Sequence, residues 1–442
     1  MPNHIKIDSR IKKFNKKITV SGDKSLSIRW VLLASQAIGK SKAYNLLESE
    51  DIKSSLNSIS KLGVKILKKK NYYEINGLGI NNFNVKKNCV LNAGNSGTLA
   101  RLILGIISGT NKKIKIIGDK SLSKRDFKRV IKPLRAFGVK IFTKKNNLPI
   151  IIKGNNFIRS IRYFENIGSA QVKSCIMLCA LNAEGITKIK AKKSRDHTEI
   201  LFKKIGIPVK IKKTAKFDYI EVVGKHEYNS FEYRIPGDIS SASFFIVLTL
   251  LSKNSKLIIK NINVNNSRTG IIDCLIKMNS KIKLINRRNY MGEKLADIYV
   301  KSTKNLKSIN CPPSINSRAI DEMLLLFLVA SVSKGVSKFT NLEELNKKES
   351  KRLDWGFKIL KMIGIKTKKI SNHGIKIYGN PELKLDKKFE IMNYLKDHRI
   401  FMLCTIAALT LGGKWKIHDK NSIKTSFPLF INILKKIGAK FN

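Results

Sequence analysis

Two stretches of the sequence, DIKSSLNSISKLGVKIL at residues 51–67 and DFKRVIKPLRAFGVKIF at residues 126–142, follow one pattern. In each, apolar residues three and four positions apart predict an amphipathic helix, a glycine closes the helix, and a short β-rich run follows. The pattern recurs, so that six helices end at residues 63, 138, 206, 279, 364 and 438. A period of roughly 70–85 residues is too long for a thin solenoid and predicts six small α/β modules.

Each module also contains an earlier helix that is apolar on nearly all faces, which predicts an interior position. These six helices are expected at residues 25–38, 97–108, 170–183, 240–251, 319–333 and 398–411. Short runs rich in Ile, Val and Lys alternate with period two and predict strands between the helices. The expected fold is therefore α/β, with a βαβαββ unit repeated six times.

Two similar turns indicate where the chain crosses between two lobes. SGDKS at residues 21–25 and PGDIS at residues 236–240 each place Gly-Asp before an interior helix. The turns predict one discontinuous lobe of residues 1–22 plus 237–442 and another of residues 23–236, with three units in each. The cleft between two such lobes is a natural ligand site.

The composition supports a packed protein with an unusual charge. Of 442 residues, 43% are hydrophobic, while 87 Lys and Arg against 31 Asp and Glu give a formal net charge of +56. The lysines are dispersed rather than clustered on one element, which indicates a compositional bias on a solvated surface and argues against specific nucleic-acid binding. Such a positive field attracts anionic substrates.

The cysteines and the apolar runs bear on cofactors and location. The six cysteines show no CxxC pair and no metal-ligand spacing with histidine, so we expect no metal and reduced thiols, as in the cytoplasm. Residues 1–17 lack the apolar core of a secretory signal. The apolar runs at 323–332 and 400–411 are shorter than the ~18–20 residues that cross a bilayer, so no membrane association is expected.

Polar residues gather where the predicted helices begin, at positions where free backbone N–H groups attract anions. Any one of them alone is typical of helix capping. Several, however, place a cation within a turn of a hydroxyl or glycine residue, which suits phosphate oxygens. Asp321 and Glu349 are carboxylates among cations, so an acid–base role is plausible.

The predicted helix starts contain, in order along the chain, the phrases GDKSLSIR, LNAGNSGTLAR, SAQVKS, SRDHTE, PGDISSASFF, AIDE, KKESKRL, DHRI and TSFP. Taken together, these phrases resemble the 5-enolpyruvylshikimate-3-phosphate synthase family, and SAQVK and RDHTE resemble its class II branch. They fall between residues 22 and 428, which covers nearly the whole chain.

The resemblance implies a two-domain enolpyruvyl transferase fold with its active site in the interdomain cleft. It implies transfer of the enolpyruvyl group of phosphoenolpyruvate to the 5-hydroxyl of shikimate 3-phosphate. The implied reaction proceeds by addition and then elimination, releases phosphate, and is a step of chorismate and aromatic amino acid biosynthesis. It implies no cofactor, and we expect a monomer whose partners are these small molecules.

The family's functional residues carry over by matching position. The resemblance implies that the catalytic residues are Lys24, Asp321 and Glu349. It implies that shikimate 3-phosphate is bound by Lys24, Ser25, Arg29, Ser169, Ala170, Gln171, Ser194, Arg195, Asp321 and Lys348. It implies that phosphoenolpyruvate is bound by Lys24, Asn95, Gly97, Arg125, Gln171, Arg352 and Arg399. Gly97 stands where glyphosate-tolerant class II relatives carry Ala, so inhibition by glyphosate is expected.

Two other functions would account for part of the sequence. The sister enzyme, UDP-N-acetylglucosamine enolpyruvyl transferase, shares the fold but uses a reactive cysteine on a mobile loop. Of the candidates Cys89, Cys175 and Cys179, the last two lie in an apolar helix. A basic nucleic-acid-binding protein would account for the charge, but the sequence offers no aromatic stacking motif.

Overall fold

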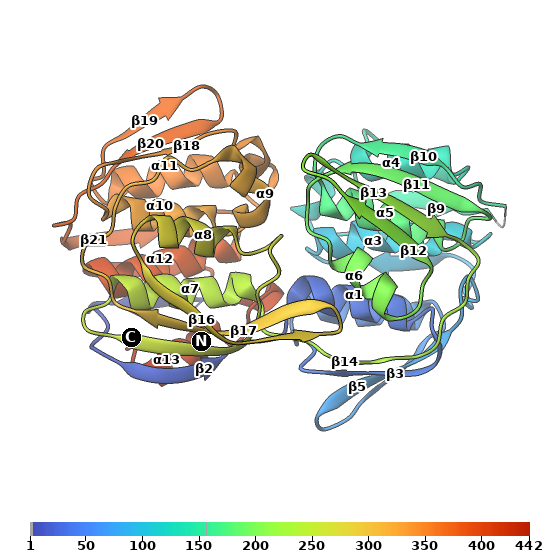
Figure 1. Ribbon diagram of the computed structural model, residues 1–442, viewed down its shortest axis with the longest axis horizontal. Coiled ribbons are helices and arrows are strands. Elements are labelled where there is room, and N and C mark those ends of the chain that lie inside the picture. The colour runs from blue at the N-terminus through green and yellow to red at the C-terminus, as the bar shows by residue number, and fades with distance from the viewer. Residues whose placement is uncertain (1–2, 156) are drawn as a thin grey trace. The chain divides into compact units, whose positions relative to one another are not determined.

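The computed structural model describes residues 3–155 and 157–442, and the chain divides into two compact units (Figure 1). Unit 1 comprises the described residues of Met1–Ser21 together with Pro236–Asn289 and Lys294–Asn442. Unit 2 comprises Gly22–Ile235 and Tyr290–Glu293. Gly22 was expected in the same lobe as residues 1–21 but belongs to unit 2, and Pro236 was expected in the other lobe but belongs to unit 1. The turn 290–293 also joins unit 2, because Glu293 pairs with His197 and Tyr290 stacks on Tyr233.

Each unit is built around three apolar helices whose residues are almost all buried. In unit 2 they are α1 (Lys24–Ala34), α3 (Gly97–Ile106) and α5 (Ala170–Ala180). In unit 1 they are α7 (Ile239–Leu251), α10 (Met323–Ser331) and α12 (His398–Leu411). A helix that is apolar on every face is stable only inside a core, because each buried Leu, Ile or Phe side chain contributes about 1.5–3 kcal/mol.

The amphipathic helices follow the interior helices along the chain, each with one buried face. In unit 2 they are α2 (Glu50–Lys61), α4 (Lys128–Ala136) and α6 (His197–Lys204). In unit 1 they are α8 (Gly270–Lys277), α11 (Arg352–Met362) and α13 (Phe430–Ile437). The predicted α/β fold with six repeated units is confirmed, although helix ends differ from the expected ones by a few residues.

The three sheets of unit 2 share one topology. In spatial order, the first two strands are parallel to each other, and each of the next two strands pairs antiparallel with the strand before it. The first sheet is β14 (Glu232–Arg234), β3 (Ile38–Tyr44), β5 (Tyr72–Leu78) and β4 (Lys65–Lys68). The second is β6 (Cys89–Asn92), β7 (Lys113–Ile117), β9 (Ile150–Lys153) and β8 (Lys140–Thr143). The third is β10 (Arg162–Glu165), β11 (Ile186–Lys192), β13 (Phe217–Val223) and β12 (Val209–Lys213).

Unit 1 repeats this topology with two variations. One sheet is complete, with β2 (Asn15–Thr19), β15 (Lys256–Asn263), β17 (Glu293–Lys301) and β16 (Lys281–Tyr290). The second is β18 (Val336–Phe339), β20 (Gly374–Tyr378) and β19 (Thr367–Ile370), and two isolated parallel bridges stand in place of its first strand. The third is β21 (Leu385–Ile391), β22 (Gly412–His418) and β1 (His4–Ile7). Its last strand therefore comes from the beginning of the chain.

The prediction of one continuous helix at residues 319–333 is wrong. The structure has a short helix, α9 (Asn316–Ala319), then a turn, and then α10. The turn contains Asp321 and Glu322, and Glu322 is completely buried and accepts a hydrogen bond from Ser240. Two carboxylates that pair with polar partners interrupt the apolar pattern at this point.

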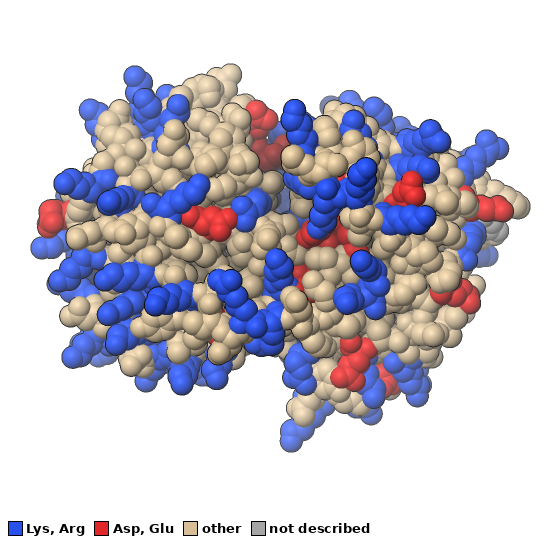
Figure 2. Space-filling model, in the orientation of Figure 1, with Lys and Arg blue, Asp and Glu red and all other residues tan. Residues whose placement is uncertain are grey.

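The surface carries the excess of basic residues without concentrating it. Figure 2 shows Lys and Arg side chains scattered over the visible face of both units, with few acidic residues between them. In the part of the chain that the structure describes, no helix is both long and apolar enough to cross a membrane.

In four of the six units, a glycine lies near or directly after the end of one antiparallel strand, which is β5, β9, β13 or β20. A Cβ at any of these glycines would fall on carbonyl oxygens at the end of that unit's interior helix. The glycines are Gly77, Gly154, Gly224 and Gly379. The absence of a side chain thus allows strand and helix to approach closely.

We expect Gly224→Ala to destabilise the protein, because the new methyl group would meet the carbonyl oxygens of Ala180 and Ala183. Overpacking of this kind costs about 1–3 kcal/mol. The matched control is Gly206→Ala, where no atom lies within 4 Å and only the positive φ of +84° opposes the change, at a cost of about 1 kcal/mol. The measurement is the midpoint of denaturant unfolding, and a midpoint for Gly224→Ala at or above that of the control would contradict this account.

Candidate functional site

Polar residues of unit 2 gather around the beginning of α1. The Asp23 side chain accepts a hydrogen bond from the backbone N–H of Leu26 and so caps the helix. Lys24 follows, and its Nζ lies 3.0 Å from Oδ2 of Asp51 on α2. The Lys24 side chain keeps about 20% of its surface exposed, so its ammonium group is held in place but accessible.

Arg29, one turn further along α1, is only 4% exposed. Its Nε donates to Thr198 Oγ1 at 2.8 Å and its Nη2 donates to Ser174 Oγ at 2.7 Å. Its Nη1 donates to the carbonyl oxygen of Ser25 at 3.1 Å. Three elements, α1, α5 and α6, therefore fix the direction of this guanidinium group.

A second cationic group lies at the start of α3. Arg101 Nη1 donates to the Gln171 side chain at 3.0 Å and to the backbone carbonyl of Gly97 at 3.2 Å. Arg125 Nη2 donates to Asn95 Oδ1 at 3.1 Å. A Cβ on Gly97 would lie 2.8 Å from Arg101 Nη1 and 2.9 Å from Arg125 Nη1, so both guanidinium groups border this glycine.

The remaining predicted residues of unit 2 lie at the starts of α5 and α6. Ser169 caps α5 by accepting from the N–H of Val172, and Ala170 and Gln171 form the first turn. Ser194 and Arg195 directly precede α6. The Ser194 hydroxyl is buried and has no hydrogen-bond partner among residues 3–155 and 157–442. A phosphate oxygen could provide that partner.

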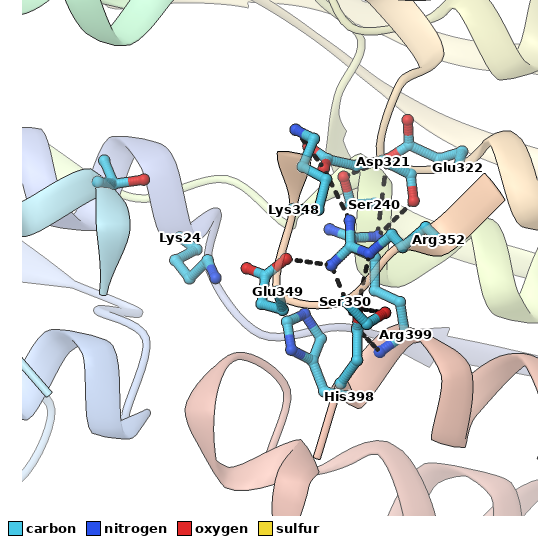
Figure 3. Close-up of polar contacts among 12 residues, drawn as sticks. Lys24, Ser240, Asp321, Glu322, Lys348, Glu349, Ser350, Arg352, His398 and Arg399 are labelled. Carbon is cyan, nitrogen blue, oxygen red and sulfur yellow. Dashed lines mark hydrogen bonds and ion pairs between the residues drawn. The ribbon is translucent and has the colours of Figure 1, made fainter. Parts of the chain in front are cut away.

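In unit 1, the predicted residues surround a buried guanidinium group (Figure 3). Arg352, at the start of α11, donates from Nε to Asp397 Oδ2 at 2.9 Å and from Nη2 to Asp397 Oδ1 at 3.2 Å. The same Nη2 lies 2.5 Å from Glu349 Oε2, and Nη1 lies 3.4 Å from Asp321 Oδ1. One arginine thus joins three carboxylates from three segments of the chain.

Burial and charge act in opposite directions on this group. Burial by itself lowers the pKa of Arg352, but the nearby carboxylates of Asp397, Glu349 and Asp321 raise that pKa above its usual value. Burial raises the pKa of Asp397, yet the Arg352 charge, together with His398 and the hydrogen bonds from Arg352, holds it below the ordinary aspartate value. The Asp397–Arg352 pair therefore stays ionised inside the protein.

The groups with accessible surface lie at the edge of this pair. The side chains of Asp321, Glu349 and Lys348 are 15%, 20% and 28% exposed. Lys348 Nζ lies 3.3 Å from Asp321 Oδ1. Arg399, in the first turn of α12, donates to the backbone carbonyl of Asp321 at 3.0 Å. The arrangement presents two carboxylates that can exchange protons beside cations that can hold an anion.

Sequence reasoning assigned no role to several residues that hold these groups. Asp397, Glu322 and Arg101 lie in the phrases DHRI, AIDE and LNAGNSGTLAR, but the resemblance assigned them no role. Ser174 and Thr198 lie in the phrases SAQVKS and SRDHTE, but nothing in the sequence indicated that they accept hydrogen bonds from Arg29, which is 145 and 169 residues away. Arg268 is also buried, and it donates to Asp238 and Ser240.

The predicted residues divide between the two units. Lys24, Ser25, Arg29, Asn95, Gly97, Arg125, Ser169, Ala170, Gln171, Ser194 and Arg195 belong to unit 2, while Asp321, Lys348, Glu349, Arg352 and Arg399 belong to unit 1. Within the described ranges, no group of three or more His, Cys, Asp or Glu residues could hold a metal ion.

Comparisons with known proteins agree along the whole chain. The family model described as EPSP synthase (3-phosphoshikimate 1-carboxyvinyltransferase) matches residues 9–434. A 3-phosphoshikimate 1-carboxyvinyltransferase of Ruthia magnifica is 38% identical over 426 residues, 96% of each chain. That of Thermodesulfovibrio yellowstonii is 38% identical over 437 residues, covering 98% of this chain and 99% of the relative.

Solved structures show the same likeness. EPSP synthase from Acinetobacter baumannii superposes with a TM-score of 0.86 at 33% identity, covering 99% of both chains. The enolpyruvyl transferase NikO from Streptomyces tendae has a TM-score of 0.77 over 99% of this chain and 98% of its own. Its identity of 13% supports the fold alone.

We expect Asp397→Asn to lower the free energy of unfolding by about 3 kcal/mol near neutral pH, because it removes one charge of a buried pair. A carboxyl whose folded-state pKa is lowered stabilises the fold above its ordinary pKa of about 3.9, and this contribution is lost as pH falls through the lowered value. The deficit of the variant should therefore stay constant from pH 7 to about pH 5 and shrink only below about pH 4.

The measurement is denaturant unfolding of both proteins across this pH range. Asp354→Asn is the control, since Asp354 is exposed in the same first turn of α11 and accepts a hydrogen bond from Asn346. A deficit for Asp397→Asn that grows as the pH falls would contradict the expected sign.

Proposed function

The chain belongs to the EPSP synthase family of 3-phosphoshikimate 1-carboxyvinyltransferases, and on this premise we propose how its two polar clusters carry out the transfer. The enzyme is a transferase of the shikimate pathway, which leads to aromatic amino acids. It transfers the enolpyruvyl group of phosphoenolpyruvate to the 5-hydroxyl of shikimate 3-phosphate and releases phosphate. The reading as a UDP-N-acetylglucosamine enolpyruvyl transferase is not favoured, because the family model and the curated relatives carry the shikimate enzyme's name.

Both substrates are anions, and the proposal assigns unit 2 the task of holding them. Arg29, Ser194 and Arg195 hold shikimate 3-phosphate, together with Lys24, Ser25, Ser169, Ala170 and Gln171. Asn95, Gly97 and Arg125 contribute to the phosphoenolpyruvate site, with Lys24 and Gln171 again taking part. The fixed direction of the Arg29 guanidinium supports this role, because a cation held in place loses little freedom when an anion binds.

In this proposal, residues of unit 1 transfer protons and also contact the two anionic substrates. Asp321 accepts the proton of the 5-hydroxyl as that oxygen bonds to C2 of phosphoenolpyruvate, while Glu349 and Lys24 deliver a proton to the methylene carbon. The methyl group of the resulting tetrahedral intermediate then returns a proton to Glu349 and Lys24, the carbon–carbon double bond forms again, and the bond from C2 to the phosphate oxygen breaks to release phosphate. Lys348 binds shikimate 3-phosphate, and Arg352 and Arg399 bind phosphoenolpyruvate.

The observation that carries this proposal is the grouping of Asp321, Lys348 and Glu349 around Arg352. The two carboxylates keep accessible surface, while Arg352 and Asp397 behind them are buried. The buried pair fixes the geometry, so the accessible carboxylates need no rearrangement during proton transfer.

We further propose that the enzyme works as a monomer in the cytoplasm. All six cysteines are buried and none forms a disulfide, which suits a reducing compartment. A sedimentation experiment tests the monomer, and a dimer at assay concentration would contradict it.

We expect Glu349→Gln to lower kcat by about 10²–10⁴-fold, because it removes a proton donor and acceptor of the reaction. KM for both substrates should change little, since the amide oxygen can still accept from Arg352. The measurement is phosphate release with phosphoenolpyruvate and shikimate 3-phosphate.

The matched control is Glu344→Gln, which alters a surface carboxylate paired with Lys347 at 2.9 Å and should leave the rate unchanged. Unchanged turnover in Glu349→Gln would remove the acid–base role. Phosphate release by the wild type with UDP-N-acetylglucosamine, and none with shikimate 3-phosphate, would overturn the proposed function.

Glyphosate should inhibit the wild type, and Gly97→Ala should raise the inhibition constant by at least about 10-fold more than KM for phosphoenolpyruvate. The added methyl group would push Arg101 and Arg125, whose nearest atoms would lie 2.8 and 2.9 Å from it. The larger ligand has less room to adapt to this shift. Gly138→Ala, where no atom lies within 4 Å, is the control, and an equal rise in both constants for Gly97→Ala would contradict the argument.

A further inference from the structure

The first turn of α6 is held by three consecutive residues, each with a buried partner from a different segment. His197 Nδ1 lies 2.6 Å from Glu293 Oε1, in the turn that joins β16 and β17. Thr198 Oγ1 accepts from Arg29 Nε on α1 at 2.8 Å. Glu199 Oε1 lies 2.6 Å from Lys173 Nζ on α5. The beginning of α6 is thus fixed from three directions.

The turn 290–293 is closely fitted to unit 2. The Tyr290 ring stacks on the buried Tyr233 ring, with centroids 5.8 Å apart and planes 19° from parallel. The Tyr290 hydroxyl accepts from the backbone N–H of Arg234 at 2.9 Å. Gly292 has a φ of +79°, and a Cβ there would lie 2.8 Å from Ile200 Cγ2 on α6. The rest of strands β16 and β17 belongs to unit 1, so the chain passes from unit 1 into unit 2 and back again at this turn.

The Glu293–His197 pair is the most buried of these contacts, since neither side chain has exposed surface. Polar groups are buried to this extent only when they have polar partners, and this contact provides one for each of the two side chains. The segment that directly precedes His197 carries Ser194 and Arg195, and the residue that follows holds Arg29. The pair therefore lies between residues that the proposed function assigns to one phosphate.

We propose that Glu293 is a positioning residue for shikimate 3-phosphate: through His197 it fixes the first turn of α6, and thereby Ser194, Arg195 and the Thr198–Arg29 contact. Glu293 itself touches no substrate. The inference rests on the proposed function, because it concerns the residues assigned to that substrate's phosphate.

The test compares Glu293→Ala with Glu293→Gln. The amide of Gln can still accept a hydrogen bond from the imidazole, whereas Ala removes this contact. Glu293→Ala should raise both the KM for shikimate 3-phosphate and its Kd, measured calorimetrically without phosphoenolpyruvate, by about 10-fold. KM for phosphoenolpyruvate should change less than about twofold, and Glu293→Gln should stay near the wild type.

The matched control is Asp297→Asn on β17 of the same hairpin. Asp297 Oδ1 accepts from the N–H of Asn261 and Oδ2 accepts from Asn286, all within unit 1. This variant should lower the thermal midpoint without changing the Kd for shikimate 3-phosphate. If Glu293→Ala does not fold, Glu293→Asp, which shortens the carboxylate by one methylene, should raise the Kd in the same direction by a smaller factor.

The outcomes separate the two claims. Wild-type protein that neither binds shikimate 3-phosphate nor releases phosphate overturns the proposed function and this assignment with it. An active wild type with an unchanged Kd in the folded Glu293 variant overturns the positioning role alone. So does an equal rise of both KM values, or the same rise of Kd in Asp297→Asn.

Discussion

Five of the interior helices begin at a Ser or Asp side chain that accepts a backbone N–H of the first turn. The caps are Asp23, Ser96, Ser169, Asp238 and Asp397. The first N–H groups of a buried helix have no partner within the helix, so they need partners elsewhere in the protein. Polar groups therefore gather at the helix starts, and most of the proposed site residues lie at or next to those positions.

Two of the caps in unit 1 show how a structural requirement becomes a reactive site. Asp397 caps α12 and also holds Arg352, and Asp238 caps α7 and also holds Arg268 at 3.1 Å. Each buried arginine balances the charge that the cap brings into the core. Burying such charges costs several kcal/mol per ion, which only a complete set of hydrogen bonds offsets. The result is a rigid base on which Asp321, Lys348 and Glu349 keep fixed positions.

The sequence allows most of the fold to be predicted, because helix periodicity and closing glycines recur at each unit. It fails where local pattern and tertiary contact disagree. The break at residues 320–322 lies inside an apolar run, and only the partners of Glu322, distant in sequence, explain it. The helix starts supplied most of the residues of the proposed site, whereas the contacts of Thr198 with Arg29 and of Glu293 with His197 span 169 and 96 residues and leave no trace in the spacing of the sequence.

The position of β1 has a consequence for how the protein is made. Strand β1 pairs with β22, and Lys6 exchanges two backbone hydrogen bonds with Asn442, so β1 contacts segments that are more than 400 residues away along the chain. At about 5–20 residues per second, translation separates the appearance of these partners by roughly 20–80 s. Nearly all of unit 2 is one continuous stretch that is complete much earlier. During synthesis, unit 2 can therefore reach a compact state while the sheet of unit 1 that contains β1 still lacks its other strands.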